Sequence, residues 1–304
     1  MGQTGCNLEV RGLISHHRHF LIILMKILII SKNLRYFFNL YPLILMTGIK
    51  EVKRFQEFLM NAWPAEQYYF LNGWILRFTK GVTYRANSVI PINYTGNNTF
   101  IENDIEMVEN AYRSFNLPTI FTMHEYFEPK ELDGVLRNRG YVEQDRTNAL
   151  LMQAHHLDLK RINNDFNYEI HNERVNQFSA LLTKFTKRDR YQQEIIKEIT
   201  NRINVPKKCF VIAKWRGEAI GTLMGVLNPQ NYFYIADVFV NPEFRRQRIA
   251  SSMLKTAIKD WAILNGVEKI WLQVELQNFN AMKLYEDFGM KKVYSYYYLR
   301  KDRF

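Results

Sequence analysis

Apolar residues recur along this chain at two spacings, one typical of helices and one typical of strands. From Met46 onward the helical spacing places Ile49, Val52 and Phe55 on one face, which predicts an amphipathic helix. Alternating and β-branched residues then predict a hairpin, and the two spacings alternate from there. The elements expected in this first half are a helix over 49–59, a hairpin of 73–78 with 82–92, a helix over 105–115, a strand over 119–123, a helix over 129–140 and a strand over 147–152.

The same alternation continues after residue 168. The turn Arg216-Gly217 separates two apolar runs and predicts a second hairpin, and 231–240 has the strongest strand pattern of the chain. Both halves therefore follow a similar order, which predicts an α+β fold with a mixed sheet, built from two tandem copies. The remaining elements expected here are helices within 172–202, over 249–266 and over 280–289, and strands over 269–276 and 291–301.

The chain length of 304 residues suits two domains, each large enough to bury a core of its own. Residues 154–167 are polar and lack a sustained period, which places the linker there. We therefore expect an N-terminal extension over 1–46, a first domain over 47–153 and a second domain over 168–304.

The extension differs in character from the rest of the chain. Its apolar stretch is interrupted by Lys26, Lys32 and Arg35, and a cation near a bilayer centre costs about 2.5 to 3.5 kcal/mol. No uncharged run reaches the length of about 20 residues that a spanning helix needs, so we expect no stable membrane span. No small-residue cleavage site follows the apolar stretch. Two interpretations stay open: residues 1–46 precede the native start near Met46, or they form a membrane-associating anchor.

The composition is that of a globular protein, with 47% hydrophobic and 23% charged residues. The two cysteines, Cys6 and Cys209, have no CxxC or Cys/His cluster beside them. We therefore expect neither a disulfide scaffold nor a metal site, and this usage fits a reducing cytoplasm. The net charge is +11, and residues 154–304 carry 25 Lys and Arg against 16 Asp and Glu. Such a field attracts polyanions, but no nucleic acid is expected because the chain has no RNA or DNA recognition signature.

One junction combines this charge with the backbone geometry of a phosphate site. The strand that ends in DVFV is followed by the turn NPE and then by Arg245, Arg246 and Arg248 at the start of a long helix. A helix N-terminus presents unpaired N–H groups and the positive end of the helix dipole, which together bind anions. The pattern favours a phosphate-bearing ligand here, and a solvated helix start is the alternative.

This junction resembles the cofactor motif of the GNAT superfamily of acetyl-CoA-dependent N-acyltransferases. That motif has Arg or Gln, two free positions, Gly, one free position and then Gly or Ala; here Arg245 and Ala250 fit, and Arg248 stands where the family usually has Gly. A second match, NFNAMKLYEDFGM over 278–290, resembles the closing motif of the family. The resemblance covers about 168–302 and implies a GNAT-like acyl-CoA-binding fold, with acetyl-CoA as the co-substrate and no metal.

The resemblance also implies roles for individual residues. Tyr285 would protonate the departing CoA thiolate, and Asp237 would act as the general base, with Glu275 as the second choice. The aspartate needs a raised pKa or a water relay for this role. Asn278 would contact the pantetheine arm, although it could instead cap its helix, and Tyr285 could be a core aromatic. The residues implied in cofactor binding are Val238, Phe239, Val240, Arg245, Arg246, Gln247, Arg248, Ile249, Ala250, Ser251, Asn278 and Tyr285.

The first half lacks a counterpart of the RRQRIA loop, and only its segment LDGVLRNRGYVEQ echoes the later LYEDFGMKKV. We therefore expect residues 47–153 to be a degenerate, non-catalytic copy of the same fold. An aromatic group in this half is expected to form core and interdomain packing, with a wall of the acceptor cleft as the alternative. The group consists of Trp63, Tyr68, Tyr69, Phe70 and Trp74.

Three functions compete at this point. The first is a cytoplasmic N-acetyltransferase that transfers an acetyl group to a primary amine of a small molecule or a peptide. The second is a catalytically inactive acyl-CoA sensor, suggested by Arg248, and the third is a basic polyanion-binding protein. The sequence does not disclose the acceptor. A homodimer is also open, because the aromatic final strand could pack against a partner subunit or against the first domain.

Overall fold

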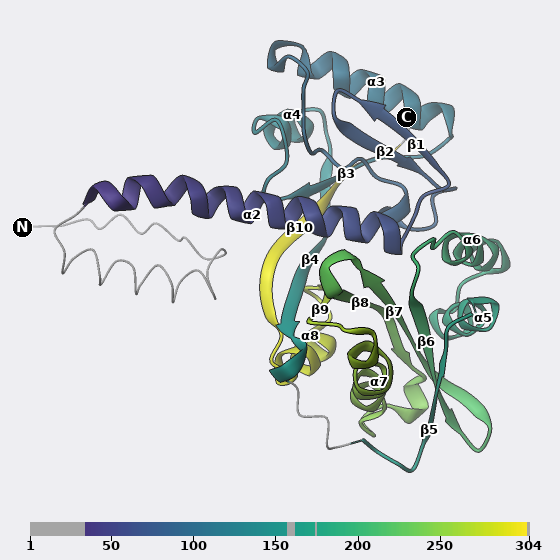
Figure 1. Ribbon diagram of the computed structural model, residues 1–304. Coiled ribbons are helices and arrows are strands. Elements are labelled where there is room, and N and C mark those ends of the chain that lie inside the picture. Colours follow the sequence, from purple (N-terminus) through teal and green to yellow (C-terminus); the bar gives the residue numbers. More distant parts are fainter. Residues whose placement is uncertain (1–33, 157–161, 174, 303–304) are drawn as a thin grey trace, which may run out of the picture.

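The computed structural model describes residues 34–156, 162–173 and 175–302 (Figure 1). Of the expected extension, residues 1–33 lie outside the described residues. Residues 34–46 begin helix α2 (Leu34–Ala62), which continues into the expected amphipathic segment. Within the three described ranges, no helix combines the length and the apolar character needed to cross a membrane.

Eight strands form one continuous mixed sheet in the order β3-β10-β4-β9-β8-β7-β6-β5, and β1 and β2 form a separate hairpin. Every neighbouring pair in the large sheet is antiparallel except β8 and β9, which are parallel. The strands are β1 (Gln67–Leu71), β2 (Trp74–Phe78), β3 (Thr119–His124), β4 (Val142–Gln153), β5 (Asn167–His171), β6 (Lys208–Trp215), β7 (Glu218–Asn228), β8 (Tyr232–Val240), β9 (Lys269–Glu275) and β10 (Lys291–Lys301).

The two halves exchange strands in the middle of this sheet. Helix α4 (Leu132–Asn138) connects β3 to β4, and helix α8 (Phe279–Asp287) connects β9 to β10, so a strand–helix–strand unit occurs once in each half. β10 lies between the two strands of the first unit, and β4 lies between the two strands of the second. The sheet therefore does not divide at the linker, and strands of both halves make its central ladders (Figure 1).

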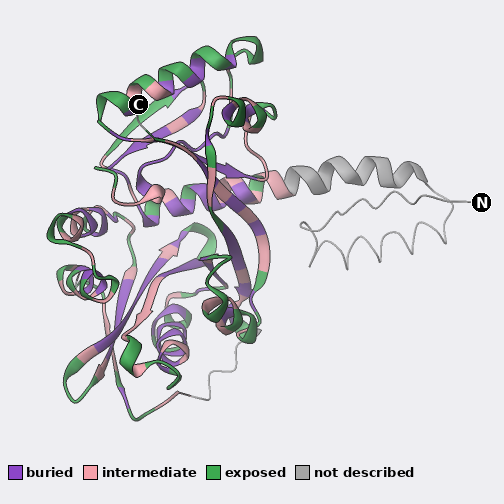
Figure 2. Cartoon of the chain, turned by 180° about the vertical axis from the view of Figure 1, so that it is seen from behind, coloured by how far each residue is buried: buried purple, intermediate pink, exposed green. Residues whose placement is uncertain are grey.

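Helices cover both faces of the sheet. On one face, which we call the α2 face, α2, α5 (Val175–Thr186) and α6 (Arg190–Asn201) pack over a core that includes the central tyrosines of β10. On the opposite face, which we call the α7 face, α7 (Ile249–Ala257) and α8 cover the second half. Helices α3 (Ile101–Ser114) and α4 cover the first half on that face. Figure 2 shows buried residues on the inner sides of these helices and exposed residues outside.

Most expected elements are confirmed to within a few residues, but the first hairpin is wrong. β2 pairs with β1 through the turn Asn72-Gly73, and it meets 82–92 in an isolated antiparallel bridge between Ile75 and Ile90. The two turn residues have φ of +45° and +86°, the backbone that Asn-Gly favours in two-residue hairpins. Residues 82–92 instead form the 3-10 turn η1 (Tyr84–Ala86) and isolated bridges at Val89 and Ile90. The apolar residues there are buried without a full ladder, and this burial produced the strand-like pattern.

The aromatic group of the first half divides in two. Trp63 and Trp74 are buried core residues, as expected. Tyr68, Tyr69 and Phe70 are exposed, with Phe70 at 68%, so the prediction of a packed group is wrong for these three. They lie on β1, which among the described strands pairs only with β2. The aromatic last strand lies inside the sheet, between β3 and β4, and its residues Tyr294, Tyr296 and Tyr298 join the core of the α2 face.

Candidate functional site

Strands β8 and β9 run side by side and then separate. Their paired residues end at Ile235 and Leu272. Beyond this point β9 stays paired with β4 as far as Glu275, and β8 stays paired with β7 as far as Val240. Backbone groups of 236–240 that point toward β9 therefore have no strand partner among the described residues. Since such groups need hydrogen bonds, this part of the sheet suits an extended ligand that pairs with backbone.

A β-bulge interrupts β8 at this point. Between the pairs made by Met224 and Thr222, one residue of β7 faces two residues of β8, and Asp237 takes a φ of +50°. Bulges of this kind re-aim a side chain. The Oδ2 atom of Asp237 is buried and has no hydrogen-bond partner among the described residues. Burial raises the pKa of Asp237, and the charges of Arg85 and Arg188 oppose this shift.

The loop from β8 to α7 has an unusual backbone. Arg246 and Arg248 have φ of +65° and +60°, and Arg248 is the N-cap of α7. Left-handed residues in such a loop turn successive N–H groups toward one side, which makes an anion-binding concavity. The N–H groups at the start of α7 add to it because they have no carbonyl partner within the helix. The side chains of 245–248 are exposed, so they leave this backbone accessible.

Hydrogen bonds hold the loop from both sides. The Asn241 N–H donates to the Ile220 carbonyl at 2.8 Å, and the Arg245 guanidinium Nε donates to the Val240 carbonyl at 3.2 Å. From the linker, the Asn163 N–H donates to the Ser252 hydroxyl at 2.9 Å, and its side-chain amide donates to the Gln247 carbonyl at 3.1 Å. The backbone of this loop is therefore held in place by contacts from both sides.

Asn278 and Tyr285 lie on α8, next to the end of β9. The Asn278 side-chain oxygen accepts a hydrogen bond from the Ala281 N–H at 3.2 Å, so it caps the helix. Tyr285 belongs to the core of the α7 face and is 7% exposed. Burial raises the pKa of its hydroxyl, and the charge of Asp237 raises it further. Both side chains thus have structural roles, and Tyr285 lies within electrostatic reach of Asp237 while keeping its proton.

The other predicted residues of this region point in different directions. Val238 and Val240 pack against the core of the α7 face. Phe239 stacks on Phe185 of α5 with ring centroids 5.2 Å apart. Glu275, the second choice for the base, is exposed at the end of β9. By burial, Asp237 is the better placed carboxylate of the two.

Two cationic residues near Asp237 were missed by sequence reasoning. Arg85 lies in η1, within a segment assigned to a strand, and Arg188 lies between α5 and α6, in the charge run KFTKRDR. Neither residue has a spacing or motif that separates it from solvated arginines. Only the packing of η1 and of the α5–α6 turn on the α2 face brings them toward the bulge.

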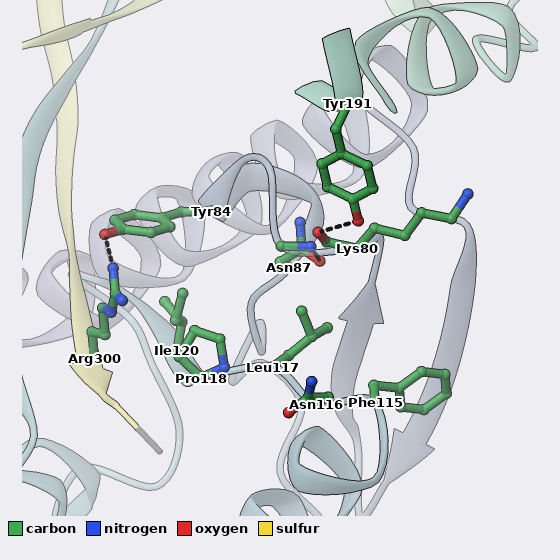
Figure 3. A pocket seen from close by; sticks show the side chains of 11 residues that line it. Lys80, Tyr84, Asn87, Phe115, Asn116, Leu117, Pro118, Ile120, Tyr191 and Arg300 are labelled. Carbon is green, nitrogen blue, oxygen red and sulfur yellow. Dashed lines mark hydrogen bonds between the residues drawn. The ribbon is translucent and has the colours of Figure 1, made fainter. Parts of the chain in front are cut away.

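A cavity of about 460 Å³ lies between residues of the two halves (Figure 3). Tyr84 and Tyr191 belong to its wall. The Tyr84 hydroxyl accepts a hydrogen bond from the Arg300 guanidinium at 2.6 Å, and the Tyr191 hydroxyl donates to the Lys80 carbonyl at 3.4 Å. None of the lining residues belongs to β8, β9 or α7, so the cavity is distinct from the place where the motif residues converge.

Known protein families match both halves of the chain. The Acetyltransferase (GNAT) family matches residues 168–290. The second half is a GNAT acetyltransferase domain. Residues 50–163 match the family described as the C-terminal region of the probable histone acetyltransferase Rv0428c. The chain is therefore a GNAT-type acyltransferase, and its first half also resembles an acetyltransferase region.

Individual relatives agree with this assignment. The chain is 24% identical over 252 residues to the uncharacterized N-acetyltransferase YobR of Bacillus subtilis, covering 82% of this chain and 98% of YobR. It is 31% identical over 102 residues to human N-alpha-acetyltransferase 30, covering 31% of this chain and 27% of that protein. The first similarity spans both halves of this GNAT protein, whereas the second covers only about a quarter of the human relative.

Solved structures share the fold over most of its length. A GCN5-related N-acetyltransferase from Kribbella flavida superposes with a TM-score of 0.61 at 12% identity, covering 84% of this chain and 96% of that one. A tandem GNAT protein from the clavulanic acid biosynthesis pathway superposes with a TM-score of 0.55 at 9% identity, covering 70% and 74%. At these identities the likeness concerns the fold alone.

Proposed function

We propose that this GNAT enzyme transfers the acetyl group of acetyl-CoA to a primary amine of a small molecule or a peptide by direct attack. The observation that supports this proposal most is the separation of β8 from β9 next to the N-terminus of α7. Free backbone groups of 238–240 suit the amides of a pantetheine arm, and the N–H groups of 247–251 suit a pyrophosphate. Asn278 lies at the start of α8, which follows β9, so its amide nitrogen would reach the same arm.

The residues of the site suit the chemistry of this transfer. The amine nitrogen forms a bond to the thioester carbonyl carbon, and the carbon–sulfur bond breaks. Backbone N–H groups of 238–240 stabilise the negative charge that develops on the carbonyl oxygen. The proton from the amine passes to Asp237, whose pKa is raised by burial, and the departing thiolate receives a proton from Tyr285.

The first test is ligand binding by the full chain. Thermal unfolding is measured with and without acetyl-CoA, with 3′-dephospho-CoA for comparison. Ligand at 100 times its dissociation constant adds about 2.7 kcal/mol to the free energy of unfolding, so a clear upward shift in the unfolding temperature is expected. If acetyl-CoA leaves the unfolding temperature of the folded protein unchanged, acetyl-CoA is not its co-substrate and the proposal is wrong.

The second test is turnover, measured as thiol release with a panel of primary amines. We expect acetylation of at least one class of amine. An acetyl-CoA shift without turnover of any amine would instead support an inactive acyl-CoA sensor. Arg248 in a position usually held by glycine is the feature that favours this second candidate.

A further inference from the structure

The turn that carries Arg85 is held rigidly. The Asn87 side chain, 2% exposed, accepts hydrogen bonds from the Thr79 N–H at 2.6 Å and from the Gly81 N–H at 3.0 Å, and it donates to the Thr83 carbonyl at 2.7 Å. Because this network fixes both ends of η1, Arg85 is placed on the α2 face at little further cost in conformational entropy.

Neighbours of Arg85 in the same turn add to this rigidity. The ring of Tyr84 packs edge-on against Tyr298 of β10 at 5.1 Å, and Figure 3 shows its hydroxyl turned toward Arg300. Ala86 is fully buried in the core of the α2 face. Arg85 thus lies between two anchored residues, which indicates a positioned side chain rather than a loosely solvated one.

Arg188 is held in a comparable way from the other half. Its N–H donates to the Thr183 carbonyl at 3.1 Å, and its own carbonyl accepts from the Gln193 side chain at 3.2 Å. The next residue, Asp189, begins α6 with a capping box formed with Gln192. The guanidinium Nη1 of Arg188 is buried and has no hydrogen-bond partner among the described residues. A buried donor without a partner is costly, so it points to a ligand.

Asp237 completes this group of charges. Its Oδ2 atom is buried and has no hydrogen-bond partner among the described residues. The stack of Phe239 on Phe185 places the α5–α6 turn beside the bulge. Ala86 and Ala236, the neighbours of Arg85 and Asp237, belong to the same core of the α2 face. The buried Oδ2 of Asp237 and the buried Nη1 of Arg188 are thus two orphaned atoms of opposite charge on this face. A ligand that carries both charges would satisfy both atoms.

We propose that the acceptor is an amine that also carries an anionic group, and that Arg85 and Arg188 bind the anionic group while Asp237 binds the amine. This inference rests on the acetyl transfer proposed above. Asp237 lies within the separated part of β8, so an amine held there lies next to the backbone of 238–240. The two arginines lie on the α2 face, whereas α7 and its anion-binding loop lie on the opposite face. They therefore recognise the acceptor, not the phosphates of CoA.

Both halves of the chain contribute to this recognition. Arg85 belongs to the first half, and Arg188 and Asp237 belong to the second. The first half, which has no counterpart of the RRQRIA loop, thus has a part in acceptor specificity.

The test compares matched amines in the acetyl-transfer assay. Each pair differs only in the anionic group: β-alanine with its carboxamide, glycylglycine with its amide, and phosphoethanolamine with ethanolamine. Hydrogen bonds to charged groups are worth about 1.5 to 3 kcal/mol, so kcat/KM for the anionic member of the preferred pair is expected to be at least about tenfold higher. Equal rates for both members of every pair would overturn the inference and leave the proposed function intact.

Variants then assign the preference to the arginines. Arg85→Gln and Arg188→Gln are each expected to reduce the ratio of kcat/KM for the anionic amine to kcat/KM for the neutral amine about tenfold or more. The charge lost near Asp237 acts on both amines and leaves this ratio unchanged. The matched control is Arg190→Gln, which removes the same charge from an exposed residue two positions away. Thermal unfolding with acetyl-CoA verifies that each variant is folded and binds the co-substrate. A preference that persists in both variants would overturn the inference, and absence of turnover with every amine would overturn it together with the proposed function.

Discussion

Thr147, in the last strand of the first half, lies directly opposite Tyr296 in the last strand of the chain. On its other side the same residue pairs with Glu275. Each half thus completes the sheet of the other. In addition, α2 packs beneath the strands of the second half, with Phe55 against Trp271 at 4.8 Å. The two halves share both a sheet and a core.

The first prediction follows from this exchange. A fragment of residues 162–304 lacks β4, so β9 and β10 would expose unpaired edges. We expect this fragment to be unfolded or aggregated when expressed alone, and the full chain to unfold in one cooperative transition. Circular dichroism and urea unfolding followed by two probes check this. Two separated transitions in the full chain would contradict it.

The second prediction concerns the left-handed residue at the start of α7. Arg248→Gly and Arg248→Ala both remove the side chain, but only glycine adopts the φ of +60° without strain. We expect the Gly variant to exceed the Ala variant in free energy of unfolding by about 1 kcal/mol. The Gly variant should bind acetyl-CoA at least as tightly as the Ala variant. Urea unfolding and calorimetric titration measure both quantities, and equal stability of the two variants would argue against a strained backbone.

The third prediction separates the role of Tyr285 in catalysis from its role in packing. Tyr285→Phe keeps the buried ring and removes the hydroxyl. Loss of a general acid typically lowers the rate by about 10² to 10⁴, so we expect kcat to fall by about 10² or more. The KM for acetyl-CoA should change little. Tyr69→Phe, at an exposed position, is the control. A kcat close to that of the unmodified enzyme would remove Tyr285 from the mechanism.

The fourth prediction concerns pH and stability. His124 is 1% exposed, and its Nδ1 accepts a hydrogen bond from the Tyr126 N–H at 3.1 Å. Burial, with a smaller effect of Lys53, lowers the pKa of His124 to about 3, whereas an unfolded histidine titrates near 6.5. Between these values the unfolded chain binds the extra proton, so the free energy of unfolding falls as pH falls. From this residue alone we expect a loss of about 3 kcal/mol between pH 7 and pH 4.

Urea unfolding across this pH range tests that contribution. In His124→Asn an amide oxygen replaces Nδ1 as the acceptor for the Tyr126 N–H. The asparagine side chain has no group that titrates in this pH range. The variant should therefore lose less stability than the unmodified protein between pH 7 and pH 4. If both proteins lose stability in parallel, His124 is not the group responsible.

Local signals account for what the sequence alone determined about this protein. The helix of 249–266, the hairpin at Arg216-Gly217 and the loop of Arg245–Ala250 each depend on residues within a few positions of one another. The same holds for the cap at Asn278. These elements and the GNAT motifs could therefore be read directly, and one local signal, the Asn72-Gly73 turn, was available but overlooked.

Tertiary structure decided the rest. Strand partners such as Thr147 and Tyr296 lie more than 100 positions apart, and an alternating pattern states which face of a strand is buried but not which strand lies beside it. The separation of β8 from β9 depends on such pairings. So does the meeting of Arg85, Arg188 and Asp237, because a charged residue in a polar segment has the same local pattern whether it faces solvent or a site. The packing of both halves on the α2 face decides which of these charged residues lie at the site and which face solvent.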